Sequence, residues 1–260
     1  MRGHVEPIRP TADWPAPVEV IAEAGTSDFV LVCEHASNHI PAEYAGLGLP
    51  PSELTRHIAW DIGAADLTRR LSARLGAPAV LGAYSRLLVD LNRPFGAPTA
   101  IPTRSEATEI PGNKGLDDRE LARRRSRIFD PFHARVAGLL GQRRQRGRAT
   151  LLVTVHSFTP VFLGVARPWH AGILFDRSGA FAHHVLDELA AEGLTVAPNE
   201  PYTVDRETDY AIPVYGTDLG LPAILVEVRN DLIADPAGVE AWADRLALAL
   251  ERTRPKVLAA

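Results

Sequence analysis

The chain has 260 residues, of which 46% are hydrophobic and 23% charged, a composition typical of a folded globular protein. Its 28 basic and 32 acidic residues give a net charge of −4, so the chain lacks the basic surface that nucleic-acid binding uses. We therefore expect no nucleic-acid partner. A single cysteine excludes an internal disulfide and a metal site built from several thiolates. Any metal site must therefore use the nine histidines and the carboxylates.

The start of the chain shows no targeting segment. Residues 1–14 are polar and lack the apolar region of a signal peptide, and we predict residues 1–27 to be an N-terminal extension. No segment approaches the run of about 18 apolar residues that a membrane-spanning helix needs. We therefore expect a cytoplasmic protein with no membrane partner.

Short apolar runs alternate with helical patterns along the rest of the chain. The runs typical of strands are residues 29–33, 79–81, 87–91, 151–155, 172–175 and 223–228. The spacing of apolar residues predicts helices over 63–75, 117–145, 181–191 and 237–252, the second kinked or divided at Pro131. Residues 94–115 are rich in proline and glycine and predict a long active-site loop. No linker interrupts this alternation, which favours a single α/β domain over residues 1–260.

Three of the predicted strands end in, or contain, residues that apolar strands rarely carry. His35 follows the first strand, His156 follows the fourth, and Glu227 lies within the last. Because ligands of open α/β sheets bind at the carboxyl ends of the strands, we expect these side chains to lie together. One such histidine is usually a packing residue, but two histidines with a carboxylate favour a metal site. Catalytic zinc takes three histidine or carboxylate ligands and keeps one position for water.

The sequence leaves the third ligand open. Asn38 stands three residues after the first histidine, a spacing that metal ligands use, but an amide is a poor zinc ligand. Asp61 precedes the predicted helix over 63–75, where it would either bind a metal or cap the helix. Glu34 and His57 are further candidates.

Three arginines are candidates for substrate binding. Arg86 and Arg93 could each bind a carboxylate through the guanidinium fork, or form an ordinary surface ion pair. Arg229 lies two residues after Glu227 and could orient it, stabilise an oxyanion or form a structural salt bridge.

Five motifs follow one another along the chain: residues 33–41 (CEHASNHIP), 57–64 (HIAWDIGA), 85–94 (SRLLVDLNRP), 155–158 (VHSF) and 226–231 (VEVRND). Together they resemble the N-formylglutamate amidohydrolase family. The resemblance covers most of the chain, from about residue 29 to residue 231.

The resemblance implies a zinc-dependent amidase with a three-layer αβα sandwich and a mostly parallel mixed sheet, similar to zinc carboxypeptidases and N-acetylmuramoyl-L-alanine amidases. By position it implies that His35 and His156 are zinc ligands and that Glu227 is the catalytic glutamate. Asn92 and Arg93 are similar to the pair with which carboxypeptidases hold a substrate carboxylate. Family members of histidine breakdown carry a motif closer to Pro-His-Ser-Gly-Thr around the first ligand. The resemblance therefore implies fold and chemistry more directly than substrate.

We expect one zinc ion, held by His35, His156 and Asp61, to serve the hydrolysis of a linear, non-peptide amide. The expected substrate is an acidic N-acyl amino acid such as N-formylglutamate, and the products are formate and the amino acid. One alternative is an amidase or peptidase that acts on another N-acyl or peptide substrate. The other is a non-catalytic protein that binds an acidic metabolite through its arginines.

Overall fold

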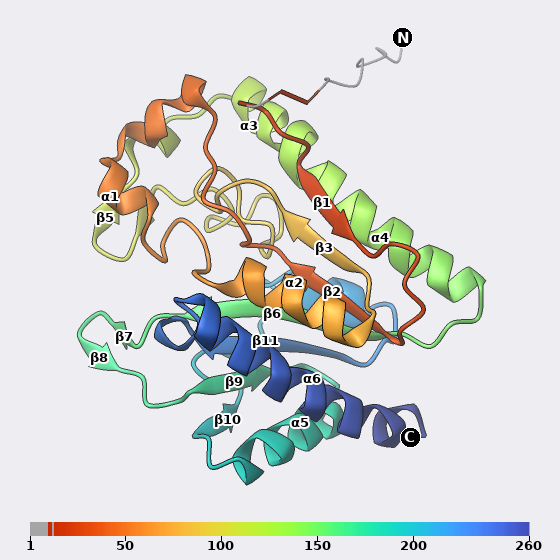
Figure 1. The fold of residues 1–260 in the computed structure, drawn as a ribbon. Coiled ribbons are helices and arrows are strands. Elements are labelled where there is room, and N and C mark those ends of the chain that lie inside the picture. Colours follow the sequence, from red (N-terminus) through yellow and green to blue (C-terminus); the bar gives the residue numbers. More distant parts are fainter. Residues whose placement is uncertain (1–9, 12, 260) are drawn as a thin grey trace.

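A computed structural model gives the fold of the chain and describes residues 10, 11 and 13–259 (Figure 1). A seven-stranded sheet forms its centre, in the order β1-β3-β2-β6-β11-β9-β10. Its strands are β1 (Val18–Ile21), β2 (Phe29–Cys33), β3 (Ala79–Gly82), β6 (Leu151–Phe158), β9 (Ala171–Leu174), β10 (Val196–Pro198) and β11 (Ala223–Arg229). Two antiparallel ribbons lie outside this sheet: β4 (Arg104–Ser105) with β5 (Thr108–Glu109), and β7 (Val161–Phe162) with β8 (Val165–Ala166).

Neighbouring strands of the large sheet are parallel except at two pairs. Strand β1 runs antiparallel to β3, and β9 runs antiparallel to β11. The three central strands β2, β6 and β11 are parallel to one another, so their carboxyl ends meet at one edge. The predicted mostly parallel mixed sheet is confirmed. The predicted extension, residues 1–27, lies partly outside the described residues, and its described part contributes β1.

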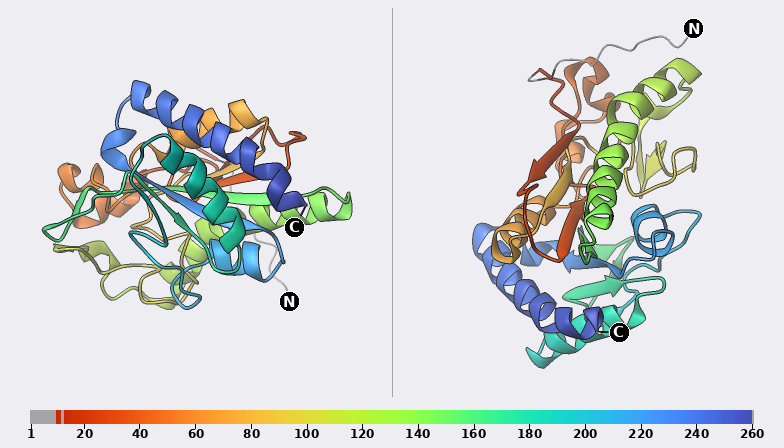
Figure 2. Two further views of the ribbon diagram at one scale, coloured as in Figure 1. Left: turned by 90° about the horizontal axis from the view of Figure 1, so that it is seen from below. Right: turned by 90° about the vertical axis from the view of Figure 1, so that its right-hand side faces the viewer.

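Helices cover both faces of the sheet, which confirms the three-layer arrangement (Figure 2). One face carries α2 (Ala64–Leu75), α5 (Gly179–Ala191) and α6 (Pro236–Leu258), and the other carries α3 (Asp118–Arg124) and α4 (Asp130–Gln145). Shorter helical segments are Ala42–Gly48, α1 (Pro51–Leu54), Pro111–Asn113, Arg125–Phe129, Ala211–Thr217 and Asn230–Leu232. In the described part of the chain, no helix has the length and apolar character needed to span a bilayer.

Strand β2 explains why the sheet separates two cores. All its residues are buried, and its side chains alternate between the faces. Phe29, Leu31 and Cys33 pack towards α2, whereas Val30 and Val32 pack towards α4. The unbroken apolar run in the sequence therefore reflects burial on both faces.

The long helix predicted over residues 117–145 is divided, as expected. Asp117 caps α3 by accepting a hydrogen bond from the Glu120 amide at 2.8 Å. A π-helical turn over Arg125–Phe129 then leads into α4, with Pro131 in its first turn. Proline lacks the amide N–H that a helix interior uses, and the π-helical turn before it changes the hydrogen-bond pattern at this point.

The strand predicted over residues 87–91 is wrong. Leu88 donates its amide to the Ser85 carbonyl at 3.0 Å, and Leu87 donates to the Ser85 hydroxyl at 3.2 Å. These contacts form turns in place of a ladder. The leucines are nevertheless buried against α4, so the apolar run reflects core packing without a strand.

Candidate active site

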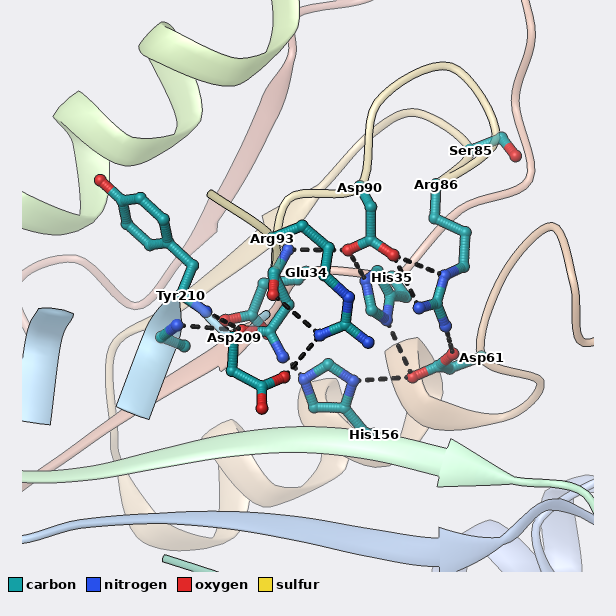
Figure 3. Close-up of polar contacts among 12 residues, drawn as sticks. Glu34, His35, Asp61, Ser85, Arg86, Asp90, Arg93, His156, Asp209 and Tyr210 are labelled. Carbon is teal, nitrogen blue, oxygen red and sulfur yellow. Dashed lines mark hydrogen bonds and ion pairs between the residues drawn. The ribbon is translucent and has the colours of Figure 1, made fainter. Parts of the chain in front are cut away.

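Three buried side chains that can bind a metal meet at the carboxyl ends of the central strands (Figure 3). His35 directly follows β2, His156 lies in the adjacent strand β6, and Asp61 belongs to the turn before α2. One ligand atom from each lies within 4.8 Å of the others. The cluster could therefore hold a metal ion.

Carboxylates hold both ring nitrogens of each histidine. The Nδ1 atoms of His35 and His156 lie 3.3 and 2.8 Å from Asp61 Oδ2. On the far sides, His35 Nε2 lies 2.7 Å from Asp90 Oδ1, and His156 Nε2 lies 3.0 Å from Glu34 Oε2. Metal-binding histidines commonly have their outer nitrogen held by a carboxylate, so this donor set fits a divalent cation.

Backbone contacts fix Asp61 within the cluster. Its amide donates to the His35 carbonyl at 3.0 Å, and the Ser157 amide donates to its Oδ2 at 3.3 Å. The Ser157 hydroxyl also donates to the Ile62 carbonyl at 2.8 Å. Helix α2 begins with Gly63 as its N-cap and has no side-chain cap. Of the two roles considered for Asp61, helix capping is therefore wrong.

Opposite charges within the cluster affect the pKa values of its side chains more than burial does. Burial acts to raise the pKa of Asp61, but His35 and His156 hold that pKa well below its ordinary value. Burial acts to lower the pKa of His156, but Asp61 and Glu34 raise it well above its ordinary value. Asp61 is therefore ionised, and its oxygens attract a cation.

Glu227 lies beside the cluster without a partner of its own. It stands opposite His156 in the pairing of β11 with β6, and its side chain helps to line a cavity of about 310 Å³. The residue is 6% exposed, and its buried Oε2 has no hydrogen-bond partner among the described residues. Burial raises the pKa of Glu227 to about 7. A carboxyl group with such a pKa can accept and return a proton near neutral pH.

The cavity brings together most of the residues singled out in the sequence: His35, Asp61, Arg86, Asn92, Arg93, His156 and Glu227. Glu34 lies behind His156 as described above. A second cavity of about 340 Å³ shares Arg86, Arg93 and Tyr202 with the first and extends to His57 and to the predicted long loop at Thr99 and Glu106.

Arg86 forms ion pairs with two carboxylates within the site. Its Nε and Nη2 donate to Asp90 Oδ2 at 2.9 and 2.6 Å, and its Nη1 donates to Asp61 Oδ1 at 3.3 Å. The guanidinium therefore ties the carboxylate behind His35 to Asp61.

Asn92 and Arg93 are joined to a segment more than a hundred residues away in the sequence. Asn92 Oδ1 accepts hydrogen bonds from the amides of Tyr210 and Ala211 at 3.2 and 2.9 Å. Arg93 Nη1 donates to the Asn92 carbonyl at 3.1 Å and forms an ion pair with Asp209.

Two further residues named in the sequence, Arg229 and Asn38, line neither of these cavities. Arg229 donates to Asp231 at 2.8 Å, the structural ion pair considered as one of its roles. The Asn38 amide donates to the Leu54 carbonyl at 2.9 Å and so holds the chain after β2.

Sequence reasoning did not single out Asp90, Asp209 or Tyr202. Asp90 carries a recognisable signal, because it is a carboxylate within an apolar run, residues 87–91. Asp209 and Tyr202 reach the cavity from the loop between β10 and the helical segment Ala211–Thr217. No pattern in that loop indicates a site.

Comparison with known proteins agrees with this architecture. The model of the N-formylglutamate amidohydrolase family matches residues 27–234. The chain belongs to this family of amidohydrolases. Among solved structures, it is similar to the gene product Atu2144 from Agrobacterium tumefaciens, with 38% identity over 93% of this chain and 96% of that chain, and a TM-score of 0.90.

A second solved structure shares the fold of this family member. It is the N-formylglutamate amidohydrolase from Ralstonia eutropha JMP134, with 20% identity, a TM-score of 0.69, and coverage of 92% of this chain and 97% of that chain. No curated protein matches the chain.

Proposed function

We propose that the chain is a zinc-dependent amidohydrolase that cleaves the linear amide of an N-acyl amino acid, with N-formyl-L-glutamate as the first substrate to test. The observation that carries this proposal is the buried cluster of His35, Asp61 and His156 beside the unpartnered carboxyl group of Glu227. Two imidazoles and a carboxylate form a common ligand set of catalytic zinc. Membership of an amidohydrolase family supports the reaction class.

The three clustered side chains would hold the ion, and zinc supplies a Lewis acid that activates water and polarises the amide carbonyl. Asp90 and Glu34 orient the two imidazoles by holding their outer nitrogens. Arg86 fixes Asp90 in turn. These contacts set the geometry before the substrate arrives, so little reorganisation accompanies the reaction.

Glu227 is the proposed general base and acid. Glu227 helps to line the cavity, and no described residue binds its buried Oε2, so the carboxyl group is available to take a proton from the attacking water. The water oxygen joins the acyl carbon, the carbon–nitrogen bond breaks, and Glu227 returns the proton to the departing amine. An N-formyl substrate then yields formate and the free amino acid.

The first test measures bound metal and turnover together. We expect about one zinc ion per chain, and we expect His35→Ala to lose it. The zinc-loaded protein is assayed against a series of N-formyl and N-acyl amino acids. A protein that binds no metal and hydrolyses none of these amides would contradict the proposal.

The second test separates the proton-transfer role from metal binding. Glu227→Gln should keep the metal and lower kcat by about 10²- to 10⁴-fold, because positioned acid–base groups contribute that much. Glu207→Gln, an exposed position in the same loop as Asp209, is the matched control and should retain wild-type kcat. Retained turnover in the Glu227→Gln variant would remove Glu227 from this role.

A further inference from the structure

Arg93, the side chain expected to bind a substrate carboxylate, already carries a carboxylate of its own chain. Its Nη1 pairs with Asp209 Oδ1, and both side chains help to line the cavity beside the metal-binding cluster (Figure 3). The side chains are 24% and 17% exposed, so water reaches this ion pair only in part. A ligand in the cavity would therefore meet the Arg93–Asp209 pair rather than a free guanidinium.

The loop holds Asp209 in this position by several contacts. Asp209 Oδ2 accepts a hydrogen bond from the Asp205 amide at 2.8 Å. The next two amides, of Tyr210 and Ala211, donate to Asn92 Oδ1. Since Asn92 and Arg93 are adjacent, one pair of neighbouring residues anchors both the backbone of this loop and its carboxylate.

The other arginine of the cavity offers no alternative anion site. Arg86 uses Nε, Nη1 and Nη2 on Asp90 and Asp61, which themselves hold the histidines of the cluster. The capacity to bind an anionic group thus rests on Arg93. Arg93 forms its hydrogen bonds to other described residues through Nη1 alone, and the Asp209 carboxylate is one of the two acceptors.

A carboxylate binds arginine best through two parallel N–H donors. The Nε and Nη2 atoms of Arg93 form such a pair and have no partner among the described residues, so a substrate carboxylate can bind them while Asp209 stays on Nη1. A carboxylate that stays beside Asp209 would suffer repulsion in a partly buried site, where such repulsion is poorly screened.

We infer that Asp209 is a specificity-determining residue, which pairs with Nη1 of Arg93 and repels a substrate carboxylate that binds the open Nε and Nη2 donors. This inference rests on the proposed function, because it takes a carboxylate-bearing N-acyl amino acid as the ligand. Asp209 keeps the partly buried guanidinium paired in the free enzyme and weakens the binding of acidic ligands. The chain thus limits how tightly it holds the substrate and the released amino acid.

The test is the affinity for L-glutamate, the product of the proposed reaction, measured by titration calorimetry. Asp209→Asn keeps the shape of the side chain but removes its charge, and it should tighten binding about tenfold or more because the repulsion between the two carboxylates disappears. The gain should vanish when Arg93→Gln is added, as a double-mutant cycle would show. Asp218→Asn, at an exposed aspartate paired with Arg206, is the matched control and should bind as the wild type does.

Unchanged or weaker binding by the Asp209→Asn variant, or no binding of L-glutamate by any of the proteins, would overturn the inference. Asp209→Ser provides a second variant if the asparagine substitution impairs folding. Turnover is assayed separately on the same samples. Tighter binding without any hydrolysis would support the role of Asp209 and contradict the proposed amidase activity, whereas hydrolysis without a gain in affinity would contradict the role of Asp209 and support the activity.

Discussion

Each histidine of the cluster is placed by the carboxylate behind it as much as by the strand that carries it. Asp90 holds Nε2 of His35, and Glu34 holds Nε2 of His156. A neutral imidazole has one N–H, so a carboxylate acceptor on the outer nitrogen directs the proton there. A cation that binds would displace any proton from the inner nitrogen, which faces Asp61, and would take its lone pair.

This arrangement predicts the effect of removing one outer charge. Asp90→Asn should weaken zinc binding by about 10- to 100-fold, since partners behind metal-binding histidines typically contribute that much. Competition with a chelator of known affinity measures the change. Asp218→Asn, a substitution of the same kind outside the site, should leave the zinc affinity unchanged. Equal zinc affinities in all three proteins would show that Asp90 does not tune the cluster.

Single residues of the site differ in how far the sequence reveals them. His35, His156 and Glu227 stand out because each interrupts or ends an apolar run. The role of Asp90 could not be deduced, because it depends on a contact between residues 35 and 90 that only the fold creates. Asp209 is harder still, because it lies in an irregular loop and meets Arg93 across 116 residues of sequence.

Among the secondary-structure elements, the sequence predicts most clearly the strands that are buried on both faces. Strand β2 is an unbroken apolar run, and its predicted bounds, 29–33, are those of the structure. Residues 87–91 have similar composition but form turns, since local contacts with Ser85 replace the pairing that a strand requires. The edge strand β1 carries few signals, because it pairs with only one neighbour and is partly exposed.

Helix α2 begins shortly after Asp61, at Ala64. Its start requires the backbone at Gly63 to lie close to the backbone at Ile233. Gly63, the N-cap, has a φ of +80°, and a Cβ atom there would lie 2.2 Å from the Ile233 carbonyl oxygen. Gly76, at the other end of the helix, has a φ of +58° but nothing within 4 Å of such an atom. The two glycines share left-handed backbone geometry and differ in the space around them.

We therefore expect Gly63→Ala and Gly76→Ala to differ in stability. Gly76→Ala should lower the free energy of unfolding by about 1 kcal/mol, the cost of a left-handed backbone for a residue with a side chain. Gly63→Ala should lower it by roughly 3 kcal/mol or more, because a backbone carbonyl must also move. Urea unfolding of the three proteins measures both effects. An equal loss of unfolding free energy in the two variants would mean that the backbone at Gly63 moves to accommodate the methyl group at no extra cost.

At the scale of the whole molecule, the core on the α4 side of the sheet holds a buried titratable group. His133 belongs to the core on the α4 side, where Phe129, Phe132 and Tyr210 surround its ring. Its Nδ1 forms a hydrogen bond with the Tyr215 hydroxyl, and its buried Nε2 finds no partner in the described part of the chain. Burial lowers the pKa of His133 to about 3.

This burial makes the stability of the whole fold depend on pH. A histidine in the unfolded chain takes up a proton near pH 6.5, whereas folded His133 stays neutral down to about pH 3. Its contribution to stability is therefore fully present above pH 6.5 and is lost as the pH falls, by on the order of 2 kcal/mol between pH 7 and pH 5. His133→Gln can keep a hydrogen bond to Tyr215 but does not titrate, so this variant should lose less stability over the same interval. Urea unfolding at both pH values gives the difference between the two proteins, in which the contributions of the metal-binding cluster cancel. Parallel losses in the wild type and the variant would show that His133 is not the group responsible.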